Sequence, residues 1–563
     1  MTFLLSAGVN VSEIDNASSI APVSTATGAY VGNFRWGPVN EITTVESETD
    51  LVAKFGAPSA TEAVDFHTAA YFLKYSRDLR VVRANNGGNS ANAGGATDLT
   101  VNNDDAYEDA TFVFANHGHF VARYPGALGN SLKVSILGFK TDASTTDTNF
   151  GNWTYGSSFD GAPGTSSYAA RFGSSNDEIH VAVIDEDGLF TGVQGTVLER
   201  FQFLSQASDA KSADGSSLYY VDVINNTSEY VRFAAVDDTN FANAGSAATG
   251  SLDYAVTPAG GVVDASLSGG DDSGSFVAGT YTAGWDLLAD SATVDVSLLI
   301  APDLASGVAV TVANHIISIA EARKDCVAFI SPVAGDDKDA IITFADSLTY
   351  SSYAFIDSAR LKVYDRYNDA YINIPACSSV AGLTADTDRT VGAWYSPAGL
   401  RRGQLRGITK LYYNPSQTDR DDLYKRGVNP VVTFPGEGTM LYGDKTHLGR
   451  PSAFDRINVR RLFIVLEKQI SQASRSTLFE FNDVYTRAQF VNLVEPDLRI
   501  IKGRRGITDF AVVCDDTNNT GAVIDRNEFV GDIYIKPARS INYIQLNFIA
   551  TRTGVDFNEI TGG

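Results

Sequence analysis

Residues 438–446 (GTMLYGDKT) come closest to a chemical motif, because they combine two glycines with a lysine and a threonine. In a phosphate-binding loop, backbone amides and the lysine ammonium surround the phosphate oxygens. Here Asp444 lies between Gly443 and Lys445, and its carboxylate would stand where an anion must approach. The spacing therefore argues against a nucleotide site.

His117 and His119 are the next candidates, since side chains two residues apart on a strand share one face and could bind a metal ion. No third ligand is recognisable near them in the sequence. A pair of histidines at a solvated strand end is the more ordinary interpretation, and we predict no metal site.

No group of residues indicates catalysis. His315 lies beside the apolar face of a predicted helix, where a packed histidine is the ordinary case, and the chain has no GxSxG or HExxH motif. Acidic residues are so numerous that no pair of carboxylates can be singled out as a general acid and base. We expect a protein that is not an enzyme and needs no cofactor.

The three cysteines, Cys326, Cys377 and Cys514, are far apart and lack CxxC spacing, so neither a disulfide framework nor a zinc site is predicted. The sequence MTFLLSAGVNVSEID has no basic region and only a short apolar run, unlike a signal peptide. No run approaches the ~20 apolar residues of a membrane-spanning helix. We expect a soluble protein of a reducing cytoplasm, without direct membrane insertion.

The charge is large and unevenly distributed. The 563 residues include 43 Lys and Arg against 67 Asp and Glu, and the net charge of −24 disfavours nucleic acid as a partner. Residues 401–563 carry 23 basic and 19 acidic side chains, whereas residues 97–292 carry 7 basic and 26 acidic ones. The acidic part alternates short apolar runs with Gly, Ser, Asn and Asp clusters, which predicts β-strands joined by solvated loops.

Apolar periodicity predicts the elements that position these residues. Near the N-terminus we expect a strand from Tyr30 to about Trp36, a helix that begins with a capping box at Ser59 and Glu62, and a strand at Leu79–Arg83. In the acidic part, residues 179–184 and 189–197 flank an Asp-Gly turn and predict a hairpin.

Further along, residues 294–300 and 326–330 are near-continuous apolar runs with a helical pattern between them, which predicts a βαβ unit with buried parallel strands. An amphipathic helix is predicted at residues 456–473 and extended segments at residues 532–536 and 541–550.

The sequence also contains longer characteristic blocks, which occur in this order: TGAYVGNFRWGP (27–38), DLVAKFGAP (50–58), DLRVVRA (78–84), YPGALGNSLKV (124–134), LSGG (267–270), WDLLADSATVDVSLLIAP (285–302), SSVAGLTADTD (378–388), WYSPAGLRRG (394–403), LYGDKT (441–446), FDRINVRRLF (454–463) and DRNEFVGDIYIKPARSINYIQLNF (525–548). In this order, and over nearly the whole chain, they resemble the tail sheath proteins of contractile-tailed, T4-like bacteriophages. Larger sheath proteins place an additional outward-projecting domain between residues 84 and 124 of this chain, where only a short Gly/Asn-rich span is found. We expect that domain to be missing or reduced.

The resemblance and the pattern of elements predict a multidomain α+β and α/β fold. It combines a central α/β domain with a βαβ unit, a β-rich acidic outer domain, and an α+β C-terminal domain whose terminal strands are donated to neighbouring subunits. The acidic part is expected on the outside of the assembly, where copies are farthest apart and salt screens their charges. The expected parts are an N-terminal arm (1–20), the first part of the α/β domain (21–96), the acidic outer region (97–292), the central α/β domain (293–400), a tube-proximal C-terminal domain (401–540) and a C-terminal arm (541–563).

The resemblance implies a structural role. The chain would form a homo-oligomer of six-membered rings, stacked helically around a tail tube protein and in contact with baseplate and tail terminator proteins. The sheath would be assembled in the cytoplasm of a bacterial host as part of the virion tail. Its metastable extended state would contract to drive the tube through the host envelope.

Such sheaths add the first and last segments of each chain to a neighbour's sheet, and the residue pattern fits because both segments alternate apolar and polar side chains. The alternative is that both strands complete the subunit's own sheet. The candidate strand-exchange residues are Val9, Val11, Ile14, Ile541, Ile544, Leu546 and Phe548.

The basic side chains of helix 456–473 are candidates for facing acidic groups of the tube, with a solvated helix face or pairing to Asp455 or Glu467 as the alternative. These tube-facing candidates are Arg456, Arg460, Arg461 and Lys468.

Two other functions stay open at this point. A secreted acidic β-rich surface or glycan-binding protein would share the composition but would need an export signal. An acidic hydrolase would show a concave pocket with perturbed carboxylates, whereas a sheath subunit would form tubes.

Overall fold

The computed structural model describes residues 25–85, 87–140, 146–237, 239–272, 276–333, 337–542 and 545. These residues divide into two units. The main unit reaches Val391 and includes Pro397–Arg460, and the C-terminal unit comprises Gly392–Ser396 and the chain from Arg461 onward. None of the helices in these ranges is both long and apolar enough to span a bilayer.

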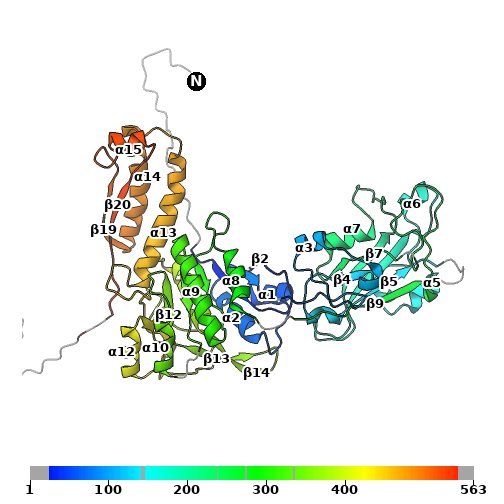
Figure 1. The fold of residues 1–563 in the computed structure, drawn as a ribbon, viewed down its shortest axis with the longest axis horizontal. Coiled ribbons are helices and arrows are strands. Elements are labelled where there is room, and N and C mark those ends of the chain that lie inside the picture. The colour runs from blue at the N-terminus through cyan, green and yellow to red at the C-terminus, as the bar shows by residue number, and fades with distance from the viewer. Residues whose placement is uncertain are drawn as a thin grey trace, which may run out of the picture. The chain divides into compact units, whose positions relative to one another are not determined.

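A seven-stranded sheet with the order β16-β12-β11-β10-β1-β3-β2 runs through the main unit (Figure 1). Neighbouring strands are parallel, except that β2 is antiparallel to β3. The strands are β1 (Gly28–Gly32), β2 (Ile42–Val45), β3 (Leu79–Arg83), β10 (Leu298–Ile300), β11 (Val327–Ile330), β12 (Ala354–Asp357) and β16 (Val428–Asn429).

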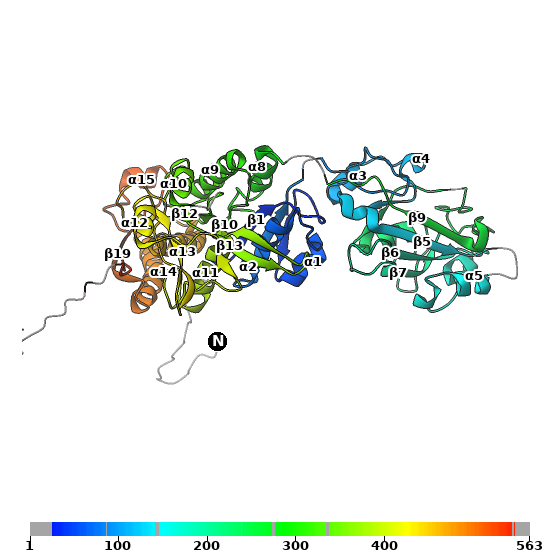
Figure 2. The same cartoon turned by 90° about the horizontal axis from the view of Figure 1, so that it is seen from below.

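Helices cover both faces of this sheet (Figure 2). On one face, Ala29 and Val31 of β1 share a core with α8 (Ala278–Asp286), α9 (Ser306–Arg323) and α10 (Lys338–Asp346). On the other face, Tyr30 bonds to Asp65 of α2 (Ala63–Leu73), which packs against α11 (Cys377–Thr390). A Cβ on Gly28 would lie 2.6 Å from the Phe72 ring, so this close approach requires glycine. Burial on both faces explains the near-continuous apolar runs of the parallel strands.

The acidic part of the main unit contains a four-stranded antiparallel sheet with the order β7-β6-β5-β9. Trp36 enters the core of this part and is 3% exposed, with ring centroids 5.4 Å from Tyr124 and 5.2 Å from Phe190. The elements here are α3 (Asp104–Asp109), α4 (Phe114–His117), β4 (Phe120–Ala122), β5 (Leu132–Gly138), α5 (Thr146–Asn152), α6 (Ser167–Arg171), β6 (Glu178–Asp185), β7 (Thr196–Ser205), α7 (Tyr220–Thr227), β8 (Val231–Phe233) and β9 (Val262–Ser266).

Smaller elements complete the main unit. Strands β14, β13 and β15 form one sheet, and β17 and β18 form another. Their bounds are α1 (Glu48–Phe55), β13 (Arg360–Asp365), β14 (Ala370–Pro375), β15 (Lys410–Leu411), α12 (Gln417–Lys425), β17 (Val431–Phe434) and β18 (Gly438–Leu441).

The C-terminal unit consists of two long helices and a two-stranded antiparallel sheet. Helix α13 (Ile457–Ser474) leads into it, followed by α14 (Val484–Gly503), β19 (Ile507–Val513), α15 (Gly521–Asp525) and β20 (Asp532–Pro537). Its core is formed by side chains of α13, α14 and the sheet, among them Leu462, Leu466, Phe490, Val494, Leu498 and Ile507.

Several predictions from periodicity are confirmed. Strand β3 has the predicted bounds, and β10, α9 and β11 form the parallel βαβ unit. Strands β6 and β7 pair as the predicted hairpin, although β7 begins at Thr196 because a loop follows the Asp-Gly turn. Strand β20 covers the segment expected at residues 532–536, and residues 541–550 lie outside the described residues except for 541, 542 and 545.

Other expectations were wrong. Strand β1 ends at Gly32 instead of continuing to Trp36, whose side chain turns into the acidic part. Ser59 does not cap α2, because its hydroxyl donates to the Glu62 carboxylate at 2.5 Å.

Two expected boundaries also differ from the structure. Helix α8 shares the central core although it falls within residues 97–292, and β16 extends the central sheet beyond residue 400.

Two buried carboxyls lie against the central sheet. Asp357, at the end of β12, accepts hydrogen bonds from the Ser331 hydroxyl at 2.6 Å and the Ala359 amide at 2.8 Å, and burial raises its pKa to about 7. Asp65 accepts bonds from the Tyr30 hydroxyl and the Asn33 amide, and burial raises its pKa to about 7 as well. Both groups favour their protonated form in the folded chain.

We predict that this preference appears in the pH dependence of unfolding. Because the folded pKa of Asp357 is raised, its contribution to stability is complete below pH 4 and is lost as the pH rises towards 7. The Asp357→Asn substitution should remove this loss, about 1.4 kcal/mol per pH unit across the window. Urea unfolding of the isolated subunit at several pH values measures it, with the exposed Asp98→Asn as control. If the free energy of unfolding changes with pH in the same way for wild type and Asp357→Asn, the raised pKa of Asp357 is rejected.

Candidate assembly surface

Strands β19 and β20 form a sheet of only two strands, paired from Ile507 with Pro537 to Val513 with Asp532. Within the described part of the chain, the outer edge of each strand has no partner strand. An open edge presents N–H and C=O groups that can pair with a further strand. The C-terminal unit can therefore accept a strand on either side.

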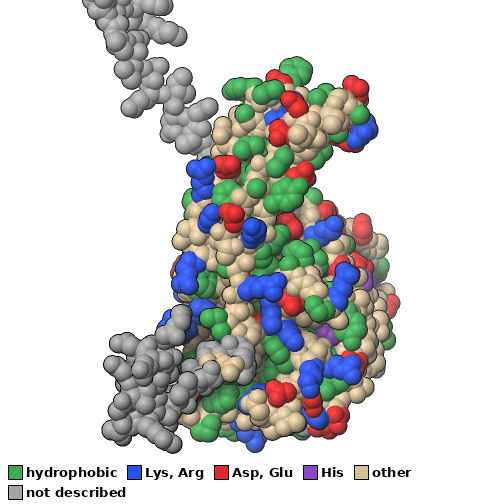
Figure 3. All heavy atoms as spheres, turned by 90° about the vertical axis from the view of Figure 1, so that its left-hand side faces the viewer, with side chains coloured by type: hydrophobic (Ala, Val, Ile, Leu, Met, Phe, Trp, Pro, Cys, Tyr) green, Lys and Arg blue, Asp and Glu red, His purple; other side chains and the backbone are tan. Residues whose placement is uncertain are grey.

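Large apolar side chains are exposed where α13 ends and α14 begins, at the end of the C-terminal unit (Figure 3). This stretch includes the most exposed aromatic side chains of the described residues. We call it the aromatic tip, and it consists of Leu478 (61% exposed), Phe479 (104%), Phe481 (84%), Val484 (71%) and Tyr485 (73%).

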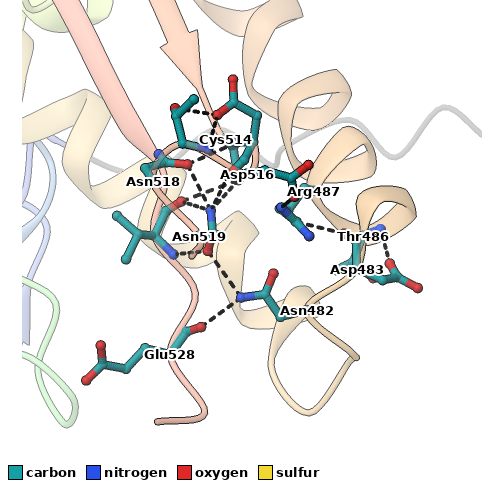
Figure 4. Close-up of polar contacts among 12 residues, drawn as sticks. Asn482, Asp483, Thr486, Arg487, Cys514, Asp516, Asn518, Asn519 and Glu528 are labelled. Atoms are coloured by element: carbon teal, nitrogen blue, oxygen red, sulfur yellow. Dashed lines mark hydrogen bonds and ion pairs between the residues drawn. The ribbon is translucent and has the colours of Figure 1, made fainter. Parts of the chain in front are cut away.

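A buried polar network holds the tip in place (Figure 4). Asn519, which is 2% exposed, donates to the Val530 carbonyl at 2.7 Å and accepts from the Val530 amide at 2.9 Å. Its carbonyl oxygen also accepts a bond from the Asn482 amide group at 3.1 Å, which in turn donates to the Glu528 carbonyl at 2.8 Å. Asn519 thus fastens the tip to the loop that leads into β20.

The start of α14 is fixed in the same region. The Asp483 carboxylate accepts a bond from the Thr486 amide at 2.8 Å, and this bond lowers the pKa of Asp483. The buried Arg487 guanidinium pairs with Asp516 at 2.5 Å. The tip is therefore anchored where the loop runs into α14.

The four basic candidates, of which Arg456 precedes α13 and the other three lie within it, do not form one exposed face. Arg460 and Arg461 are 4% and 1% exposed, so the expectation that they are available outside was wrong. The Arg460 guanidinium lies over the Tyr353 and Phe454 rings, 4.4 and 3.9 Å from their centroids. Arg456 pairs with the buried Asp444 at 2.9 Å, and Lys468 is half-buried.

The segment that resembled a phosphate loop has a structural role. Residues 438–441 are strand β18, the Asp444 carboxylate receives Arg456, and the Lys445 ammonium donates to the Tyr424 carbonyl. These contacts place the segment within the fold of the main unit.

The two histidines and a basic cavity of the main unit are the other candidate sites among the described residues. His117 is in α4 and accepts a bond from the Val113 amide, while His119 bonds to the Ala235 carbonyl. No group of three potential metal ligands occurs among the described residues. A cavity of about 720 Å³ is lined by Lys425, Arg426, Lys445 and Arg450 with one carboxylate, Asp455, which is not the pair that a hydrolase needs.

Comparison with known proteins identifies the family. Three family models match: "Tail sheath protein Gp18 domain III N-terminal region" over residues 25–84, "Phage tail sheath protein central domain" over residues 276–447 and "Phage tail sheath C-terminal domain" over residues 450–551. The tail sheath protein of Vibrio phage KVP40 is 34% identical over 673 aligned positions, covering 99% of this chain and 100% of the relative. The chain belongs to the phage tail sheath family.

A second relative is similar in sequence, and two solved structures are similar in fold. The tail sheath protein of Enterobacteria phage T4 is also 34% identical, covering 99% of both chains. The crystal structures of sheath tail proteins from Desulfitobacterium hafniense and Listeria innocua are each 12% identical, with TM-scores of 0.54, and cover 94% and 93% of this chain and 100% and 94% of their own. Sheath proteins are structural components of contractile tails and not enzymes, which confirms the expected class.

The described residues include only one of the predicted strand-exchange residues. Ile541 is 82% exposed at the end of the described chain. The candidates Val9, Val11, Ile14, Ile544, Leu546 and Phe548 lie outside the described residues. Sequence reasoning missed the aromatic tip, although its signal was present, since the loop sequence STLFEFND places three large apolar residues between two helices.

We predict that the tip depends on Asn519. The Asn519→Ala substitution would leave the Val530 peptide and the Asn482 amide without their partners, so the free energy of unfolding should fall by about 1–3 kcal/mol. Urea unfolding of the subunit measures the change. The exposed Asn152→Ala should stay within about 0.5 kcal/mol of wild type, and an equally small effect at Asn519 would contradict the role of the network.

Proposed function

We propose that this chain is the subunit of a contractile tail sheath, that it polymerises as stacked six-membered rings around a tail tube, and that it contracts from a metastable extended state. The observation that carries the proposal is the two-stranded sheet of β19 and β20 with its open edges. Family membership supplies the class of assembly, and the open edges supply a means of joining copies.

The arms at the two ends of the chain are the proposed strands for these edges. Residues 9–12 and 544–548 alternate apolar and polar side chains, as a strand with one buried face does. Each backbone hydrogen bond contributes about 1 kcal/mol net, so a five-bond strand holds neighbours together by several kcal/mol. Such a joint does not need a rigid contact between subunit bodies, and it can persist while the bodies rotate during contraction.

The proposed partners follow from the same assembly. The acidic part of the main unit faces outward, and the C-terminal unit lies towards the tube. Among the candidates within α13, Lys468 is proposed as the tube contact, because it is half-buried whereas Arg460 and Arg461 are buried. Baseplate and tail terminator proteins would meet the first and last rings of the virion tail, which is assembled in the host cytoplasm.

We predict that deleting residues 1–15 or residues 541–563 leaves a folded subunit that does not form stable sheath. The deleted segments contain the arms and none of the core described above. Electron microscopy of the purified chain shows whether tubes form, and thermal unfolding shows whether the subunit is folded. Normal tubes from either deletion would refute strand exchange through that arm, and an unfolded subunit would show that the strand is internal.

Two substitutions at one position test whether the N-terminal arm acts by pairing as a strand. Val11→Pro removes a backbone donor and should block tube formation, while Val11→Ile keeps the strand and should allow it. Equal tube formation by the two variants would place Val11 outside the added strand.

A further inference from the structure

The aromatic tip is costly for an isolated subunit. Its five apolar side chains are all more than 60% exposed and adjoin one another in sequence. A contiguous apolar surface of this kind is a mark of a protein–protein contact. Phe479 also has a φ of 70°, in the left-handed region that non-glycine residues seldom occupy. Strain of this type persists where function retains it.

The tip is also preorganised for binding. Asn519 and Asn482 bond it to the loop before β20, and the Arg487–Asp516 pair holds the first turn of α14. Aromatic side chains on a fixed backbone lose little conformational entropy when a partner arrives. They therefore have the properties of binding hot spots.

The tip adjoins one particular end of the two-stranded sheet. The same loop that bonds to Asn482 carries Asn518, whose side chain bonds to the carbonyl of Val513 and the carboxylate of Asp532. Val513 and Asp532 form the pair where β19 ends and β20 begins. A strand added antiparallel to β19 would have its own N-terminal end at this point.

The sequence of the N-terminal arm supplies an apolar group at the matching distance. Phe3, Leu4 and Leu5 precede the alternating segment that starts at Val9 and are not part of its alternation. In an added strand, at about 3.3 Å per residue, they would reach roughly 13–20 Å beyond Val9. In the C-terminal arm the apolar run 548–550 lies within the predicted strand itself, and residues 551–563 contain no run of three apolar residues.

We propose that Phe3, Leu4 and Leu5 of a second copy of this chain dock on the aromatic tip, while the rest of that arm adds to the free edge of β19. The inference rests on the proposed strand exchange and names its direction and its anchor. The added strand lies antiparallel to β19, and the apolar segment covers Phe479 and Phe481. In this arrangement the aromatic tip binds the neighbouring subunit, and pairing with the edge of β19 sets the register of the added strand.

Disulfide trapping between two full-length variants tests this contact. One variant carries Leu4→Cys and the other Phe479→Cys, and they are mixed, assembled and mildly oxidised. The native cysteines are buried, which keeps the background low. We expect a disulfide-linked dimer in assembled tubes and none in the unassembled subunits. Leu4→Cys mixed with the exposed Gln417→Cys is the matched control and should give none.

The alternative occupants give different products. A dimer from Leu546→Cys with Phe479→Cys, and none from Leu4→Cys, would assign the tip to the C-terminal arm and overturn the proposal. A crosslink of Phe479→Cys to the tube protein in whole tails would overturn it as well. Tubes that form normally without any crosslink at Leu4 would refute the docking alone, while failure of the wild-type chain to form tubes would refute the proposed function.

A mutant cycle provides a second readout. Replacing Phe479 and Phe481 by Ser, or residues 3–5 by Ser, should each raise the concentration needed for assembly roughly tenfold or more. Because both changes remove one contact, combining them should add little further effect. The exposed Leu400→Ser should leave assembly unchanged, and unaltered thermal unfolding shows that each variant folds. Fully additive effects of the two changes would reject a direct contact.

Discussion

The structure depends on the burial of the central parallel sheet on both faces. Its strands are short, three to five residues for most of them, and a sheet of this kind cannot stand alone in water. Helices α8, α9 and α10 supply one apolar layer, and α2 and α11 supply the other. The acidic part and the C-terminal unit have cores of their own and lie outside these two layers.

Predictions from the sequence succeeded where a single physical rule decides the outcome. Strand β3 and the βαβ unit were predicted correctly because full burial imposes apolar runs and an unbroken helical period. They failed where a side chain has a competing partner. Ser59 has the spacing of a cap, but the Glu62 carboxylate takes its hydroxyl.

The candidate site shows the same limit. A helical wheel places Arg460 and Arg461 on the polar side of α13, yet long arginine stems pack well against apolar surface, and aromatic rings accept the guanidinium. The sequence shows that Asp444 is incompatible with a phosphate-binding loop. That its ion-pair partner is Arg456 could be learned only from the structure. The open edges of β19 and β20 could not be predicted from amino-acid composition, because an edge is open only when no other strand pairs with it.

The two-stranded sheet of β19 and β20 limits how many strands one subunit can accept from its neighbours. In the proposed assembly, a subunit with two acceptor edges and two donor arms makes four strand joints, so every interior edge of the lattice is filled. The lattice stops at two ends, where the joints that a further ring would make stay empty. A joint between an arm and an edge is not symmetric, because donor and acceptor are different parts of the chain. The two ends of such a tube are therefore chemically different and need different proteins to close them.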